Sequence, residues 1–88
     1  MEPERPHYVY LLRCGDGTFY CGSTVDIAAR IAAHARGRGA RYTRGRGPLE
    51  LVYSEQCQDR SAALRREAEI KRLGRREKMA LIGSGHAG

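Results

Sequence analysis

The sequence predicts an α+β domain in which helices pack on a three-stranded sheet, with the elements in the order ββαβαα. Two aromatic-rich apolar runs flank Gly15-Asp16-Gly17, and Asp-Gly between such runs is a strong hairpin signal because glycine accepts a positive φ. A third run, LELVYSEQC, has the β-branched and aromatic content of a strand. Apolar residues recur at helical spacing after the hairpin and again after the third run.

The hairpin is predicted to join a strand over residues 8–14 to a strand over residues 18–23. Apolar side chains occupy both alternating faces of the first strand, which indicates that both faces are at least partly covered. A two-residue loop would place Tyr10 and Tyr20 on opposite faces of the sheet. A three-residue loop with Gly17 in the left-handed conformation would place them on one face. The turn residues alone leave both registers open.

The first helix is predicted to begin after Asp26, because a carboxylate at this position can accept hydrogen bonds from the first turn. Gly37 is expected to end it. The apolar stripe at helical spacing comprises Ile27, Ala28, Ile31 and Ala35. Arg30 and His34, four residues apart, lie on one side just beside that stripe. Both could reach a cleft from there, but polar residues at the margin of an ordinary amphipathic helix would follow the same pattern.

Residues 36–47, RGRGARYTRGRG, are predicted to form a long exposed loop. Its five arginines repel one another, and its glycines remove helical preference. Long ordered loops in small domains are more often functional than not.

The remaining elements are predicted as a strand over residues 49–57 and helices over residues 62–73 and 75–82. Asp59 or Ser61 is expected to cap the first of these helices, and Gly74 to separate the two. We expect a single domain over residues 7–83, with flexible tails over residues 1–6 and 84–88.

Composition limits the class of protein further. The chain of 88 residues is 41% hydrophobic and 30% charged, as in a soluble globular domain. It has no membrane-spanning run and no secretory signal, so a cytoplasmic location is expected. Cys14, Cys21 and Cys57 are odd in number and form no CxxC pair, so we expect them to pack as small apolar residues. The net charge of +6, almost all from arginine, favours a nucleic-acid partner, although many small proteins are basic for solubility alone.

The second predicted helix contains an acidic residue out of place. Its buried face is predicted to comprise Ala63, Leu64, Ala68 and Ile70. Glu67 lies near the middle of that arc, where a carboxylate is costly unless it is paired or holds a metal ion. An i,i+4 ion pair with Lys71 and a functional carboxylate both account for this position.

These side chains fit one chemistry, the cleavage of a phosphodiester bond. Such a site needs an activated nucleophile, a divalent cation, and cationic donors for the charge that develops on the phosphate. Phenols on the hairpin, one carboxylate on the second helix, and Arg and His on the first helix would supply them. The sequence has no nucleophile elbow, P-loop, dinucleotide fingerprint or zinc pattern that would indicate another chemistry.

With these residues in view, the sequence resembles the GIY-YIG endonuclease superfamily, and within it the small stand-alone bacterial branch. Tyr8-Val9-Tyr10 stands where the family has Gly-Ile-Tyr, and Tyr20-Cys21-Gly22 where it has Tyr-Ile-Gly. Arg30 matches the first-helix arginine, with His34 one turn later, and Glu67 matches the second-helix glutamate. The resemblance covers roughly residues 7 to 82.

The resemblance implies a three-stranded antiparallel sheet flanked by helices, and cleavage of DNA with one divalent metal, Mg²⁺ or Mn²⁺. By that resemblance Glu67 would hold the metal and Tyr20 would act as general base on the attacking water. Tyr10 would help to place the water or the phosphate, Arg30 would stabilise the transition state, and His34 would assist. This interpretation requires Tyr10 and Tyr20 to share a face, so it predicts the three-residue loop or another loop of odd length.

The leading hypothesis is therefore a metal-dependent DNA endonuclease that selects branched, nicked or single-stranded structure rather than sequence. The expected nucleic-acid contacts are Arg36, Arg38, Arg41, Tyr42, Arg44, Arg46 and Lys71. Ser23 stands where several family members carry a lysine, so one cation is missing. A nucleic-acid-binding module that has lost useful catalysis is the alternative, and a protein–protein adaptor with a basic loop is a third class.

Overall fold

The computed structural model describes residues 6–39 and 43–84. Its elements are β1 (His7–Arg13), β2 (Phe19–Thr24), α1 (Ile27–Ala35), β3 (Glu50–Cys57), α2 (Arg60–Lys71) and α3 (Arg75–Ser84). The predicted α+β class and the order ββαβαα are confirmed, with small shifts at the element ends. Arg41, Tyr42 and nearly all of the two predicted tails lie outside the described residues. Within the described ranges, no helix is long and apolar enough to cross a membrane.

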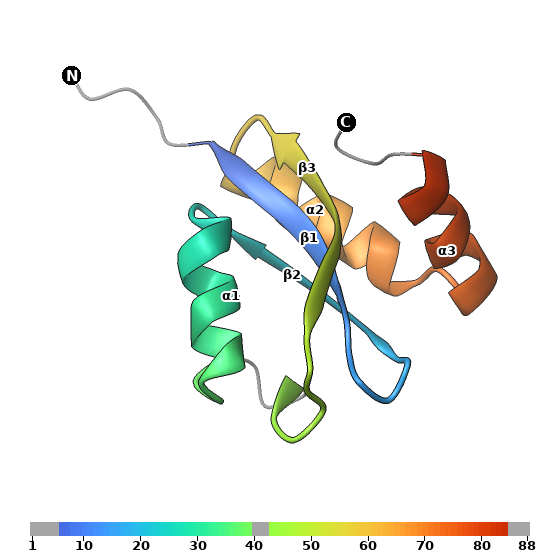
Figure 1. Ribbon diagram of the computed structural model, residues 1–88. Helices are drawn as coiled ribbons and strands as arrows, with labels where there is room; N and C mark the ends of the chain where they lie inside the picture. The colour runs from blue at the N-terminus through green and yellow to red at the C-terminus, as the bar shows by residue number, and fades with distance from the viewer. Residues whose placement is uncertain (1–5, 40–42, 85–88) are drawn as a thin grey trace.

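The sheet has the strand order β2-β1-β3, and both neighbours of the central strand β1 run antiparallel to it. The helix α2 crosses one face of the sheet, while α1 stands beside β2 on the opposite face (Figure 1). The central strand β1 is therefore hydrogen-bonded along both edges, to its hairpin partner β2 and to β3. The site described below lies on the α1 side of this sheet.

The core forms around β1, whose side chains are buried on both faces. Val9 and Leu11 point toward α2 and pack with Cys21, Tyr53, Ala63 and Ile70. Tyr10 and Leu12 point to the other face and are buried just as fully. A strand apolar on both alternating faces was expected to be covered on both, and the burial confirms this.

The β1–β2 hairpin has the three-residue loop. Leu12 pairs with Tyr20, the Cys14 N–H donates to the Thr18 carbonyl at 2.8 Å, and Gly17 has φ +86°. Asp16 accepts hydrogen bonds from the Thr18 N–H at 3.1 Å and from the Thr18 hydroxyl at 2.6 Å, which holds the turn. Because side chains alternate along a strand, this register places Tyr10 and Tyr20 on one face, and that prediction is confirmed.

The helix α1 begins as predicted, with the Asp26 carboxylate accepting from the Ala29 N–H at 3.0 Å. The predicted apolar stripe is wrong at Ala28 and Ala35, which are exposed, and the buried residue of α1 is His34. The helix is only nine residues long, and the loop that follows it covers its C-terminal end. Burial there is therefore set by the loop, which helical periodicity does not describe.

The buried face of α2 is narrower than predicted. Ala63 and Ile70 are buried, but Leu64 is 47% exposed and Ala68 is also exposed, so the prediction was wrong at both. Ala63 and Ile70 are seven positions apart, about two helical turns, and share one line along the helix. A sheet of three strands covers little more than that line. The N-cap of α2 is Asp59, whose carboxylate accepts from the Ala62 N–H at 2.8 Å.

The arginine- and glycine-rich loop is packed against the hairpin turn, and it is not exposed throughout as predicted. Thr43 within it is 2% exposed. Arg46 pairs with Asp16 at 2.5 Å, and the Arg46 carbonyl accepts from the Gly15 N–H at 2.5 Å. A Cβ at Gly15 would lie 2.2 Å from the Gly47 carbonyl oxygen, so the contact requires glycine. The turn of the first hairpin thus positions the loop that follows α1.

Candidate active site

The two motif tyrosines stand side by side on the α1 face of the hairpin. Their ring centroids are 6.3 Å apart and the rings are tilted by 52°. Gly22 lies opposite Tyr10 in the ladder, and a Cβ there would lie 2.6 Å from the Tyr10 hydroxyl oxygen and 3.0 Å from Tyr20 Cε2. The glycine of the second motif is therefore what allows both rings to approach the backbone of β2 this closely.

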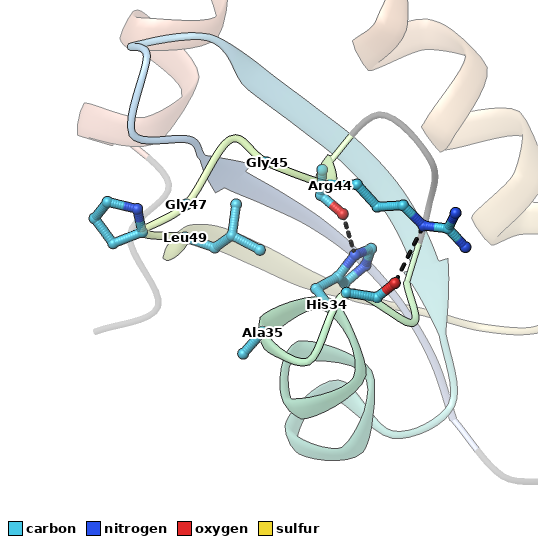
Figure 2. Close-up of a pocket in the computed structure, with 9 residues that line it drawn as sticks. His34, Ala35, Arg44, Gly45, Gly47 and Leu49 are labelled. Atoms are coloured by element: carbon cyan, nitrogen blue, oxygen red, sulfur yellow. Dashed lines mark hydrogen bonds between the residues drawn. The ribbon is translucent and has the colours of Figure 1, made fainter.

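His34 joins α1 to this pair. Its ring is 3% exposed, and its Nε2 lies 2.9 Å from the Tyr10 hydroxyl oxygen. Its Nδ1 lies 2.9 Å from the Thr43 hydroxyl oxygen, a contact drawn as a dashed line in Figure 2. The Tyr20 ring packs edge-on against the imidazole, with centroids 5.3 Å apart. A hydrogen-bonded chain thus runs from Tyr10 through His34 to the arginine-rich loop.

The imidazole of His34 is held in its neutral form. Burial lowers its pKa, and the nearby positive charge of Arg30 lowers it further. A neutral imidazole donates from one ring nitrogen and accepts at the other, and both Tyr10 and Thr43 carry hydroxyls that can do either. The chain can therefore pass a proton in either direction without leaving a buried charge.

Arg30 is exposed, one helical turn before His34. Its positive charge lowers the pKa values of Tyr10 and Tyr20 as well as that of His34. A charge that acts on all three rings lies over the same space. An exposed guanidinium in that place can bind a phosphate with its planar fork of donors.

Glu67 lies on α2 next to β2, where its carbonyl oxygen is 4.0 Å from the Cys21 Sγ. Its side chain is 17% exposed, and its Oε2 accepts from the Lys71 ammonium at 2.7 Å. The i,i+4 pair that the sequence offered as a structural explanation is therefore present. The carboxylate is also close enough to the phenols for its charge to raise the pKa values of Tyr10 and Tyr20. Glu67 is thus paired with Lys71 and also close enough to influence both tyrosines.

Both phenols are held in the protonated form. Burial, the largest cause, and the neighbouring Tyr20 raise the pKa of Tyr10 to about 12. Burial also raises the pKa of Tyr20, while the charges of Lys71 and Arg30 lower it. Lys71 thus supplies a cation beside Tyr20. Ser23 pairs with Val9 and lies on the face opposite the tyrosines, so it contributes nothing beside them.

The donor set fits one hard divalent cation. Among the described residues, no three His, Cys, Asp or Glu side chains come together, so a tetrahedral zinc centre has no ligand set there. Mg²⁺ and Mn²⁺ are oxygen-preferring ions, and Mg²⁺ keeps several waters and binds through one or two carboxylates plus substrate phosphates. Glu67 is the one carboxylate that would hold such an ion, and it would have to share or release the Lys71 ammonium to do so.

Five of the seven predicted nucleic-acid contacts lie within the described residues, and they divide into three groups. Arg36 and Arg38 are exposed just after α1. Arg44 is exposed but donates from Nε to the Gly37 carbonyl at 3.1 Å. Arg46 and Lys71 pair with acidic side chains, the first holding the loop on the hairpin turn. Arg41 and Tyr42 lie outside the described residues.

Two residues of the site were missed from the sequence, Thr43 and Gly39. Thr43 holds the second nitrogen of His34, and a Cβ at Gly39 would lie 2.0 Å from that nitrogen. Both belong to the arginine- and glycine-rich loop, where no periodic pattern indicates which side chain turns inward. The only local signal was one threonine among arginines and glycines.

Comparison with known proteins places this geometry in a family. A family model described as the GIY-YIG catalytic domain matches residues 6–80. The chain is 51% identical over 76 residues to a UPF0213 protein of Natronomonas pharaonis, covering 86% of this chain and 89% of that protein. A UPF0213 protein of Halalkalibacterium halodurans is 50% identical over 76 residues, covering 86% of this chain and 81% of that protein.

Two solution NMR structures resemble the fold. The structure of the UPF0213 protein from Bacillus halodurans matches with a TM-score of 0.58 and 49% identity, covering 89% of this chain and 83% of that one. The structure of a protein from E. faecalis matches with a TM-score of 0.64 and 37% identity, covering 96% of this chain and 90% of that one.

Proposed function

The chain belongs to the GIY-YIG catalytic domain family, and from this premise we propose that it is a metal-dependent endonuclease that hydrolyses phosphodiester bonds in DNA. The observation that supports the proposal is that Tyr10, Tyr20 and His34 pack together, and that Arg30 and Glu67 lie near enough for their charges to shift the pKa values of both phenols. The five side chains of the proposed site are Tyr10, Tyr20, Arg30, His34 and Glu67. We further propose that the enzyme recognises branched, nicked or single-stranded DNA by its structure rather than its sequence.

In this reaction a water molecule attacks the phosphorus, the bond to the leaving oxygen breaks, and Tyr20 as phenolate takes the proton of the water. Burial opposes the phenolate, so Tyr20 depends on the positive charges of Lys71 and Arg30, which lower its pKa. Arg30 binds the phosphate and stabilises the charge that develops on its oxygens. A divalent ion held by Glu67 would neutralise phosphate charge and lower the pKa of a nearby water.

Tyr10 and His34 position the reacting groups. The hydrogen bond between the Tyr10 hydroxyl and His34 Nε2 fixes where the phenol oxygen lies, and Tyr10 in turn packs against Tyr20. Burial raises the pKa of Tyr10 to about 12, so the phenol stays protonated. When His34 Nε2 is the donor in their hydrogen bond, the Tyr10 O–H can donate to a phosphate oxygen or to the water. The neutral imidazole of His34 can accept a hydrogen bond from the Tyr10 hydroxyl or donate one to it, and so assists any proton transfer through Tyr10.

The alternative function is a DNA-binding module with the same fold and little catalysis. The Glu67–Lys71 pair at 2.7 Å favours it, because the ammonium competes with a metal ion for the carboxylate. The raised pKa values of both phenols favour it too, because they limit the supply of phenolate.

A cleavage screen tests the proposal and separates the two functions. Branched, flapped, nicked, single-stranded and plain duplex DNA are incubated with the protein in Mg²⁺, in Mn²⁺ and in EDTA. The endonuclease predicts cutting of at least one non-duplex form in a metal ion and no cutting in EDTA. Salt-sensitive binding without cutting of any form would support the module instead.

A further inference from the structure

A cavity of about 350 Å³ lies behind His34, on the side away from the tyrosines' hydroxyls. It opens between the C-terminal end of α1 and the loop that leads to β3 (Figure 2). His34 and Ala35 line it from the helix, and Gly45, Gly47 and Leu49 line it from the loop. Its volume is at the small end of the range of ligand pockets, about 300–1,000 Å³.

The cavity shares a wall with the proposed active site. The imidazole of His34 lines it, and the same ring bonds Tyr10 through Nε2 and packs against Tyr20. A group that enters the cavity would therefore lie one imidazole away from the phenols.

The walls suit a flat, largely apolar group. Leu49, Ala35 and the glycines carry no charge, and a Cβ built at Gly45 or Gly47 would meet no atom within 4 Å. The backbone at these two glycines thus borders open space. Flipped bases are held in such pockets between apolar surfaces, with a few polar groups at the edge. Arg44 lines the cavity and is fixed there by its bond to the Gly37 carbonyl.

The surroundings suit a polyanion. Arg36 caps α1 next to Ala35, and Arg38 follows; both are exposed. A strand whose phosphates lie along these arginines would carry its bases toward the cavity. A paired base is stacked inside its duplex and cannot enter without being flipped out, whereas an unpaired base can.

We infer that this cavity receives one unpaired nucleobase of the DNA strand, from a nucleotide next to the phosphate that the proposed endonuclease cuts. The inference rests on the proposed function and deepens it, because it names the feature of the DNA that the enzyme selects. Single-stranded DNA and the single-stranded arms of flaps satisfy it, and intact duplex does not.

The test measures base insertion directly and does not depend on cleavage. Single-stranded oligonucleotides carry one 2-aminopurine, moved one position at a time, and are bound to the protein in EDTA. Fluorescence anisotropy of an end label reports binding, and the emission of 2-aminopurine reports the surroundings of that base. We expect the emission to change at one position only, and an abasic nucleotide there to weaken binding by about tenfold.

Two variants fill the cavity from opposite walls. Ala35→Phe places a ring from the exposed end of α1, and Gly47→Leu adds a side chain where a Cβ meets no atom within 4 Å. Ala28→Phe on the same helix is the matched control, since Ala28 is exposed and outside the cavity. Each filled variant that keeps its fold by circular dichroism should lose the position-specific emission change, while Ala28→Phe keeps it.

The outcomes separate the two claims. Anisotropy binding with the same emission change at every position, or with an unaltered change in both filled variants, would overturn the base pocket and leave the endonuclease standing. No binding of any DNA by the wild-type protein at low salt would overturn the proposed function, and the base pocket with it.

Discussion

Position 22 needs a glycine because neighbouring side chains leave no room for a Cβ, and not because of its backbone, which has no positive φ. Among the described residues, positive φ values occur at Gly17, Gly37 and Gly45. The space above Gly22 is filled by the Tyr10 hydroxyl and the edge of the Tyr20 ring. One missing methyl group thus sets the positions of both phenols.

Replacing Gly22 by alanine should therefore displace the tyrosines and destabilise the protein. We expect a loss of about 1–3 kcal/mol in the free energy of unfolding, the usual cost of overpacking. Urea denaturation gives the value. Gly83→Ala in α3 is the control, because a Cβ there meets no atom within 4 Å, and it should stabilise the helix by about 0.5–1 kcal/mol. Equal stability of Gly22→Ala and wild type would contradict the close contact.

The buried imidazole of His34 should make stability depend on pH. Its pKa is lowered in the folded protein by burial and by Arg30, so the unfolded chain binds this proton more readily. Stability from this residue is present above the unfolded value of about 6.5 and falls as the pH drops below it. Unfolding midpoints between pH 7.5 and pH 5.5 should decline in the wild type and decline less in His34→Gln. A midpoint that rises as the pH falls would contradict a lowered pKa of His34 in the folded protein.

At the scale of elements, the sequence predicted the strands, the helices and the register of the hairpin, but not how the helices face the sheet. The turn allowed two registers, and the requirement that Tyr10 and Tyr20 meet selected one of them. The exposed Leu64 shows why helix faces were harder. Periodicity gives the apolar side of a helix, but the width of the covered strip depends on the partner sheet.

The loop after α1 was the least predictable element. Its inward residue, Thr43, is selected by the path that the contacts between Arg46, Asp16 and Gly15 impose on the loop. Those contacts are distant in sequence and follow no local pattern. The loop was therefore recognised as arginine-rich, but its support of His34 was not.

Thr43→Val should loosen the link between that loop and α1. The hydroxyl that bonds His34 Nδ1 is lost, and weakening a buried hydrogen bond costs about 1–3 kcal/mol. Thr43→Ser keeps the hydroxyl and should recover most of the stability. The ¹⁵N chemical shifts of the His34 ring report whether one tautomer still dominates, and they should move in the valine variant alone. Identical ring shifts in all three proteins would exclude a positioning role for Thr43.

At the scale of the whole molecule, the basic side chains that give the net charge of +6 have different surroundings. Arg13, Arg46, Arg66 and Lys71 form ion pairs with carboxylates of the same chain. Arg36 and Arg38 are exposed beside the proposed site. We therefore expect Arg36 and Arg38 to be the charges beside the site that contact DNA phosphates.

Salt dependence of DNA binding measures that distribution. The slope of log K against log salt should fall in magnitude by about one for Arg36→Ala and by about one for Arg38→Ala, since each removes one phosphate contact. Arg76→Ala, on α3 and exposed, is the matched control and should leave the slope unchanged. An equal change for all three variants would indicate that the protein binds DNA through its overall charge alone.

The central claim is that the five converging side chains form a metal-dependent phosphodiesterase site. Nicking of supercoiled plasmid in Mg²⁺ or Mn²⁺, compared among wild type, Glu67→Gln, Tyr20→Phe and the exposed α2 control Glu69→Gln, tests it most directly. We predict nicking by the wild type and by Glu69→Gln, and a loss of about a hundredfold or more in the other two. Nicking that survives both Glu67→Gln and Tyr20→Phe at the wild-type rate would contradict the site.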